Sequence, residues 1–139
     1  MAKYGGKDLK IEFDNAAGSL VDMSQYITEL GGIKINAALE DSHAFGDAWG
    51  EKLFSFLRSM DDITGRGFYD DTASTGPDVI FNDVGNTGTT GTRTLKVTWG
   101  GTKTTSVETW IMSYSRIGTR GALTQFEFTL SLTGAPTEA

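Results

Sequence analysis

One segment near the C-terminus, residues 123–134, constrains the fold more than any other. Between Phe126 and Leu132, apolar side chains occupy every second position and polar side chains lie between them. Successive side chains of a β-strand point to opposite faces, so this alternation predicts a strand with one buried face and one hydrated face. Gly134 and Pro136 mark the expected end of the strand. A strand of this kind usually completes a sheet, which predicts an antiparallel β-domain.

The same alternation recurs along the chain and predicts further strands at residues 9–13, 33–36, 63–69, 94–99 and 104–116. Glycine-containing turns at 100–101 and 118–121 would join the last three strands into an antiparallel meander. Residues 20–30 fit either a bent strand or a short helix. Six or more strands in 139 residues predict one domain of the mainly β class, an antiparallel β-sandwich or partial barrel.

One short α-helix is expected to flank the sheet, at about residues 51–60 within a long loop at about 38–62. Four apolar residues there have the spacing i, i+3, i+4 and i+7 of one helix face: Leu53, Phe56, Leu57 and Met60. Phe54 lies off that face and is expected to be exposed or to contact a partner. Pro77 favours another helix of one or two turns, in which it would be the first residue.

The ends of the chain are expected to lie outside the sheet. Residues 1–8 are glycine-rich and lack periodicity, which predicts a flexible N-terminal arm. The β-domain would then span residues 9–134, and residues 135–139 would form a C-terminal tail. The first residues also lack the apolar segment of a signal peptide.

Composition excludes several classes of function. The chain has no cysteine, so disulfides and thiolate metal sites are absent. Its net charge is -6 and its 12 Lys and Arg residues are scattered, which argues against binding DNA by neutralising phosphates. No apolar run approaches the ~20 residues that a membrane-spanning helix needs. We expect no membrane association.

The sequence contains no catalytic constellation. His43 is the only histidine, and no Gly-x-Ser-x-Gly motif is present. A hard cation held by His43, Asp41 and Asp47 is a weak alternative, because the spacing lacks that of a Ca²⁺ loop. Paired aspartates at 61–62 and 70–71 are better explained as turn formers. We therefore expect no enzyme activity, no cofactor and no metal.

The strand predicted at 104–116 is apolar on both faces. Val107 and Ile111 would lie on one face, and Trp110, Met112 and Tyr114 on the other. Both faces then need cover. A loop or helix of the same chain would supply it in a monomer, and a neighbouring subunit would supply it in an assembly.

Three stretches resemble the major tail tube proteins of long, non-contractile-tailed bacteriophages: Ala44-Phe-Gly-Asp-Ala-Trp49, Gly67-Phe-Tyr-Asp-Asp71 and Phe128-Thr-Leu-Ser-Leu-Thr-Gly134. Their order and spacing extend the likeness over nearly the whole chain. The resemblance implies a structural virion protein whose copies self-assemble in the host cytoplasm. Six copies would form a ring with a continuous inner β-barrel, and stacked rings would form the tail tube through which DNA is ejected.

The resemblance also implies partners and interfaces. The partners would be further copies of the chain, the tape measure, tail tip and terminator proteins, and viral double-stranded DNA that passes without specific binding. Residues 1–8, about 38–62 and 134–139 would make contacts between rings. Two aromatic stretches, at 54–56 and 110–112, are more apolar than the family pattern. Candidate interface residues are Phe45, Asp47, Trp49, Phe54, Phe56, Trp110 and Met112.

A ring of this kind is physically compatible with a DNA conduit. Four strands from each of six copies would form a barrel with a backbone diameter of roughly 48 Å, wide enough for a DNA duplex. An acidic wall would repel phosphates. The candidates for acids that face the lumen are Glu12, Glu108 and Glu127.

Two other functions fit the same pattern. The first is a tail terminator or a tube component of a contractile injection system. The second is a small β-sandwich carbohydrate-binding module, which would need an exposed aromatic platform. Trp49, Trp99 and Trp110 are the candidates for that platform.

Overall fold

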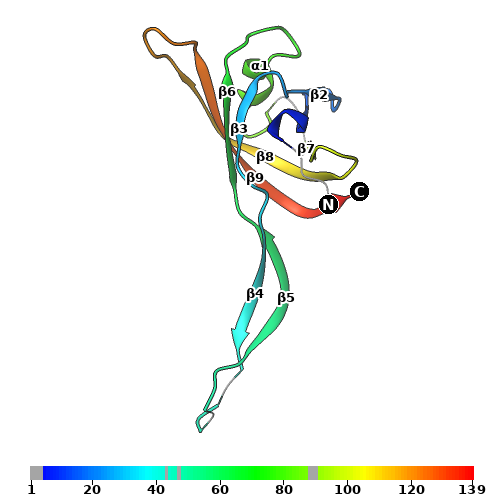
Figure 1. Cartoon of the computed structure of the whole chain (residues 1–139), viewed down its shortest axis with the longest axis vertical. Coiled ribbons are helices and arrows are strands. Elements are labelled where there is room, and N and C mark those ends of the chain that lie inside the picture. The colour runs from blue at the N-terminus through cyan, green and yellow to red at the C-terminus, as the bar shows by residue number, and fades with distance from the viewer. Residues whose placement is uncertain (1–4, 43, 47, 88–90) are drawn as a thin grey trace.

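The computed structural model describes residues 5–42, 44–46, 48–87 and 91–139. The fold is mainly β, and all strand pairs are antiparallel (Figure 1). One sheet has seven strands in the order β2-β1-β7-β8-β9-β6-β3, and β4 and β5 form a separate hairpin. The strands are β1 Lys10–Asp14, β2 Leu20–Asp22, β3 Ile27–Leu30, β4 Ile35–Asp41, β5 Lys52–Met60, β6 Ile63–Phe68, β7 Arg93–Thr98, β8 Thr104–Ile117 and β9 Gln125–Glu138; the helices are α1 Pro77–Phe81 and a 3₁₀ turn, Gly6–Asp8.

The large sheet is curled because its two edge strands are consecutive in sequence. β2 and β3 lie at opposite edges of the sheet, but only residues 23–26 separate them. A link of that length spans at most roughly 18 Å, so the edges must approach each other at one end. Met23 N donates to Ile11 O on β1 at 2.8 Å, and Phe68 N, on β6, donates to Tyr26 O at 2.8 Å. The partial barrel predicted from the sequence is therefore confirmed, in the form of a single curled sheet.

Two glycines of β6 allow this closure. A Cβ atom on Gly67 would lie 2.1 Å from Tyr26 O, where the linking segment crosses the strand. A Cβ atom on Gly65 would lie 2.4 Å from the ring of Phe128, so that ring occupies the space a side chain would need. Glycine inside a strand commonly marks such a close approach of backbone or ring.

The concave face of the sheet holds the core. Phe126, Phe128 and Leu130 of β9 are buried there, as the alternation predicts. Helix α1 covers the concave face, because the ring of Phe81 stacks on Phe128 with centroids 4.2 Å apart and meets Phe13 at 4.8 Å. The remaining buried apolar residues come from six elements and the turn after β2: Ile11, Met23, Ile63, Ile80, Leu95, Val97, Val107, Ile111 and Leu132. The predicted helix that begins at Pro77 is confirmed.

A cluster around Asp78 fastens the first turn of α1 to β8. The Asp78 carboxylate accepts hydrogen bonds from Tyr114 Oη at 2.6 Å and from Arg116 Nε at 2.8 Å. The hydrogen bonds from Arg116 and Tyr114, together with the positive charge of Arg116, outweigh burial and lower the pKa of Asp78. The same cluster raises the pKa of Tyr114, because burial and the neighbouring carboxylate both disfavour the phenolate.

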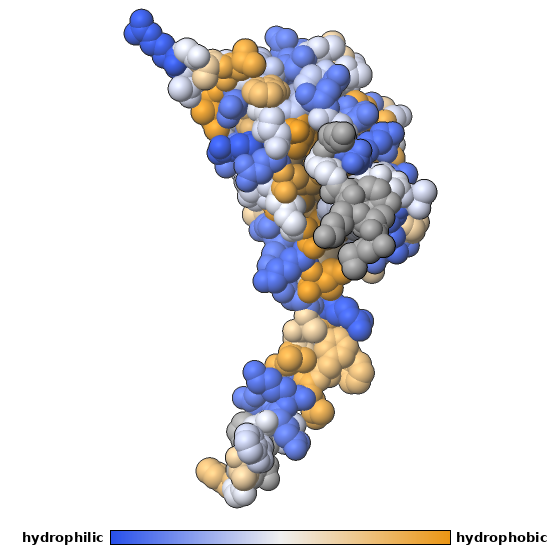
Figure 2. Space-filling model, in the orientation of Figure 1, coloured by the Kyte–Doolittle hydropathy of each residue, from blue (hydrophilic) through white to orange (hydrophobic). Residues whose placement is uncertain are grey.

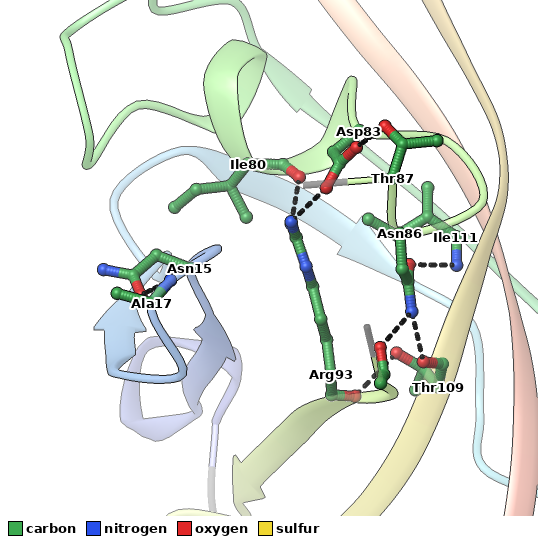
Figure 3. A network of polar contacts seen from close by, with 10 residues as sticks. Asn15, Ala17, Ile80, Asp83, Asn86, Thr87, Arg93, Thr109 and Ile111 are labelled. Carbon is green, nitrogen blue, oxygen red and sulfur yellow. Dashed lines mark hydrogen bonds and ion pairs between the residues drawn. The ribbon is translucent and has the colours of Figure 1, made fainter. Parts of the chain in front are cut away.

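A second cluster fastens the other end of α1 to the sheet (Figure 3). The buried Arg93 guanidinium of β7 donates to Ile80 O at 2.7 Å and pairs with Asp83 just after the helix. Asn86 is also buried; its side chain donates to Thr109 O at 3.3 Å and accepts from Ile111 N at 3.2 Å. The turn that follows α1 is thereby held against β7 and β8.

The prediction of a helix at residues 51–60 is wrong. Residues 52–60 form β5, and the predicted loop at 38–62 is instead mostly the β4–β5 hairpin. Ala37 pairs with Arg58 and Leu39 pairs with Phe54, so three residues of β5 lie opposite Ala38 alone. Neither face of β5 is buried, so its apolar residues need not alternate, and their spacing imitates a helix face.

The predicted boundaries at the two ends also change. β9 does not end at Gly134; it continues to Glu138, and Thr104 and Ala139 exchange two backbone hydrogen bonds, so residues 135–139 are not a tail. Of the predicted N-terminal arm, residues 1–4 lie outside the described part of the chain, and residues 6–8 form the 3₁₀ turn. Residues 20–30, left open between strand and helix, contain β2 and β3.

Replacing Gly67 by alanine tests the closure of the sheet. The added methyl group would displace Tyr26 and the link between the edge strands, so we expect the free energy of unfolding to fall by about 1–3 kcal/mol. Gly118→Ala is the matched control, because no atom lies within 4 Å of a Cβ at that position. Urea unfolding of both variants gives the comparison. Equal stability of the two variants would contradict this account of the closure.

Replacing Asp78 by asparagine tests the helix anchor. Because folding lowers the pKa of Asp78, its carboxylate adds stability above the unfolded-state pKa of about 3.9, and this stability is lost as pH falls through the lower folded-state value. The wild-type protein should therefore lose more unfolding free energy than Asp78→Asn between pH 5 and pH 3. Urea unfolding at both pH values measures this, with the exposed Asp62→Asn as control. Parallel losses in wild type and Asp78→Asn would exclude the anchor.

Candidate assembly surfaces

The β4–β5 hairpin, called the arm below (residues 35–60), projects away from the body of the molecule (Figure 1). Figure 2 shows apolar residues along the arm and at its junction with the body. A two-stranded hairpin is at best marginally stable alone in water. The arm nevertheless exposes several large apolar side chains: Ile35, Leu39, Leu53, Phe56 and Leu57. Such a surface is typical of a contact with another protein chain.

The shaft of the arm carries an unusual arrangement around Phe56. Its backbone has φ 64°, a left-handed conformation that bulky residues rarely adopt, and its side chain is 89% exposed. The rings of Phe54 and Phe56 lie 5.4 Å apart, and the Arg58 guanidinium lies 4.9 Å from the centroid of the Phe54 ring. Strained backbone with an exposed aromatic ring is typical of a functional position.

The tip of the arm carries two more of the predicted interface residues. Phe45 is fully exposed and Trp49 is 84% exposed. Asp47, predicted with them, lies outside the described residues, as does His43 of the alternative cation site. Among the described residues no group of three or more His, Asp or Glu side chains is placed to hold a metal ion.

The second candidate surface is the convex, polar face of the sheet. Glu12, Glu108 and Glu127 all lie on this face, because the residues next to each of them in the strand point into the core. Thr94 and Thr92 donate to the Glu108 carboxylate at 2.6 and 2.8 Å. Many hydroxyl residues share this face: Thr64, Thr98, Ser106, Ser113, Ser115, Thr129, Ser131 and Thr133.

Two of the three glutamates lie beside a cation. Arg66 Nη2 is 3.6 Å from Glu127 Oε2, and Lys10 Nζ is 3.7 Å from Glu12 Oε1. Both pairs are at least partly exposed, so they contribute little to stability. Lys96 lies on the same face, opposite Glu12 of β1 and Ser106 of β8, so the face carries cations among its acids. Side-chain alternation along the strands was sufficient to find this face.

Trp110 and Met112 lie on β8, away from the arm. Trp110 pairs with Ser131 on the polar face, and both Trp110 and Met112 are about half exposed. A bulge between Ile111 and Ser113 then reverses the face of the following residues. Tyr114 consequently packs against the core, which corrects the prediction that it shares a face with Trp110. The six predicted interface residues that the structure describes thus belong to two separate surfaces, the arm and β8.

The aromatic platform of the carbohydrate-binding alternative is not formed. Trp49 lies at the tip of the arm, Trp99 follows β7 and donates through Nε1 to Thr105 Oγ1 at 2.8 Å, and Trp110 lies in the middle of β8. The three rings therefore occupy different parts of the molecule. No helix in the described part of the chain is long and apolar enough to cross a membrane.

Several solved structures have a fold similar to that of this chain. No protein-family model and no curated protein sequence matches the chain. Among solved structures, a chain in the C6-symmetric tail of an empty gene transfer agent particle is similar, with a TM-score of 0.74, 22% identity and 99% of each chain covered. A chain in the six-fold symmetrised baseplate of the anti-feeding prophage has a TM-score of 0.74 and 9% identity, with 100% of this chain and 95% of that chain covered.

A chain in the sheath–tube complex of an extracellular contractile injection system is also similar, with a TM-score of 0.69 and 11% identity, over 99% of this chain and 91% of that chain. The likeness is therefore not specific to long, non-contractile tails. Over its whole length, the chain has the fold found in tail and tube assemblies of gene transfer agents and contractile injection systems.

Proposed function

We propose that this chain is the building block of a tail tube, in which six copies close into a ring and stacked rings enclose a channel for DNA. The observation that carries the proposal is the one-sided sheet. α1 and the core cover its concave face, whereas its convex face is mostly polar, Trp110 being an exception, and no element of the described residues covers it. A sheet of this kind suits the wall of a water-filled channel.

The strand order supports ring closure. β8, β9, β6 and β3 are contiguous, and β3 is an edge strand of the sheet that the described residues form. β7 pairs only with residues 104–109 of β8, so residues 110–117 of β8 have no partner strand on that side among the described residues, and those beyond Ile111 would be free to pair with β3 of the next copy. Six copies would supply 24 strands, enough for a barrel with a backbone diameter of roughly 48 Å. The six-fold number is taken from the symmetry of the gene transfer agent tail and the anti-feeding prophage baseplate. An unpaired edge also requires protection, which pairing around a ring would provide.

The chemistry of the polar face supports passage of a polyanion. The cations Lys10, Lys96 and Arg66 on this face lie among its glutamates, Lys10 and Lys96 beside Glu12 and Arg66 beside Glu127, so they would hold phosphates only weakly. Arg66, the cation on the β6 part of this face, lies beside Glu127. DNA would therefore move past the wall without binding to it. The tape measure, tip and terminator proteins of a long phage tail are the further partners that this function requires.

A second candidate is the inner tube of a contractile injection system. The similarity to the anti-feeding prophage baseplate and to the sheath–tube complex favours it as strongly as the fold alone can. A tube of this class is surrounded by a sheath, so its outer surface must bind a second protein. Co-expression with the proteins encoded beside it would separate the two candidates, because only a contractile system would yield a sheathed tube.

Electron microscopy of the concentrated, purified protein tests the tube function. We expect six-fold rings and stacked, open-ended tubes with a central channel, since β3 is an edge strand of the described sheet and the arm exposes several large apolar side chains. Compact monomers at all concentrations, with neither rings nor tubes, would overturn the proposal.

A substitution that adds a positive charge tests whether the polar face points into the channel. Thr129→Lys adds a charge in the middle of the β9 part of that face, and six copies would add a ring of them. We expect tubes of this variant to retain short duplex DNA in a salt-sensitive manner and to protect it from nuclease. Ser19→Lys, in the exposed turn after β1, is the control. Bound DNA that stays sensitive to nuclease would place the polar face outside the channel.

A further inference from the structure

The turn after α1 caps the edge of β8 at the point where β7 begins. The first residue of β7, Arg93, pairs with Thr109 of β8. The next position along that edge is taken by the turn: Gly85 N donates to Ile111 O at 2.8 Å, and the Asn86 side chain accepts from Ile111 N at 3.2 Å. The turn thus completes the hydrogen bonding of Ile111 as one more residue of β7 would (Figure 3).

Asn86 suits this position because its amide is both a donor and an acceptor. The side chain is buried, and its Nδ2 donates to Thr109 O at 3.3 Å and to Gly91 O at 3.1 Å. An amide can therefore satisfy the carbonyl of Thr109 and the N–H of Ile111 at once. The backbone of Asn86 has φ 57°, a left-handed conformation in which asparagine is enriched.

Beyond the cap, the edge of β8 is open. Residues 112–117 continue β8 and have no partner strand on that side in the described part of the chain. An open strand edge is a template for pairing with another chain. β3 of a second copy fits this edge, because β3 is antiparallel to β6, β6 to β9 and β9 to β8. The pairing of β3 with β8 of the next copy would therefore be antiparallel, like every pair within the chain.

The two faces of the sheet limit the registers that this pairing can take. Glu29 of β3 lies on the polar face and Leu30 on the core face. Ser115 and Tyr114 of β8 are divided between the faces in the same way. Glu29 opposite Ser115 and Leu30 opposite Tyr114 therefore keep both faces continuous from one copy to the next. A slip of one residue would turn the next copy inside out.

A slip of two residues would keep Glu29 among polar residues, and the cap at Ile111 opposes it. In that register Glu29 would lie opposite Ser113, and Gly31 would lie opposite Ile111. The turn already occupies the place that Gly31 would need, and both backbone groups of Ile111 are bonded to it. The slip would move one copy by roughly 7 Å along the strands relative to its neighbour.

We propose that Asn86 is a stop that fixes the register between neighbouring copies, because it keeps β3 of the next copy from pairing with β8 at Ile111. The stagger of the strands and the diameter of a closed barrel are linked, so every junction between copies must have the same register for rings to be uniform. The proposal rests on the proposed tube function, since it specifies how the copies of one ring are joined.

Cysteine cross-linking reads the register, because the chain has no cysteine of its own. Glu29→Cys with Ser115→Cys should give a ladder of covalent oligomers on mild oxidation, whereas Glu29→Cys with Ser113→Cys should give little. Neither pair can close within one chain, because β9 and β6 separate β8 from β3 by roughly 14 Å, beyond the reach of a disulfide. Equal ladders from the two pairs would exclude a fixed register.

Asn86→Gly removes the stop in the same backgrounds. Glycine adopts φ 57° without strain, so the turn can keep its backbone conformation. The yield from the Ser113 pair should rise several-fold relative to the yield from the Ser115 pair. Thr109→Val is the matched control, because it removes a buried hydrogen bond to Arg93 O, at 2.9 Å, and leaves the cap in place. It should keep the original ratio, and an unchanged ratio in Asn86→Gly would overturn the stop.

Electron microscopy of the same samples separates this inference from the tube function. Rings or tubes without a ladder from either pair would overturn the pairing of β3 with β8, and the stop with it, and leave self-assembly into a tube standing. A ladder from the Ser115 pair without rings or tubes would support the register and count against the tube. Neither a ladder nor a ring would overturn both. The comparison of the two pairs in the chain that retains Asn86 does not depend on the stability of Asn86→Gly.

Discussion

The short link between the two edge strands is the constraint on which the rest of the structure depends. Residues 23–26 connect opposite edges of a seven-stranded sheet, so the sheet must curl until those edges approach each other. Gly67 makes the approach possible, because any side chain there would collide with the backbone of Tyr26. A flat sheet with this strand order would need a much longer connection.

The curl divides the sheet into two chemically different faces. On the concave side, the rings of Phe81, Phe126 and Phe128 stack on one another, and the Asp78 and Arg93 clusters hold α1 in place. A helix of five residues is too short to be stable alone, so its position depends on these contacts. The convex side is left with hydroxyls and paired charges. One fold thereby supplies both a core and a hydrophilic wall.

The arm and the body differ in how far their apolar side chains are buried. The body buries its apolar residues within the chain, whereas the arm leaves many of its own exposed and strains its backbone at Phe56. Bulges in β5 and β9, which weaken the pairing of each strand, converge on a groove at the base of the arm. Stability is therefore concentrated in the body, whereas the arm carries exposed apolar side chains and a strained backbone.

The sequence by itself determined the β class, the meander of β7, β8 and β9, the helix that begins at Pro77 and the shared face of Glu12, Glu108 and Glu127, because each follows from a local period or from a turn residue. It did not determine the arm, the face of Tyr114 or the length of β9. Bulges are involved in all three. One extra residue in β8 reverses the face of Tyr114, whereas β5 and β9 each carry two extra residues opposite a single partner, and where a bulge falls depends on which strand lies opposite. The curl of the sheet, the anchoring of α1 by Arg93 and the groove likewise depend on residues far apart in sequence, so only the tertiary structure decided them.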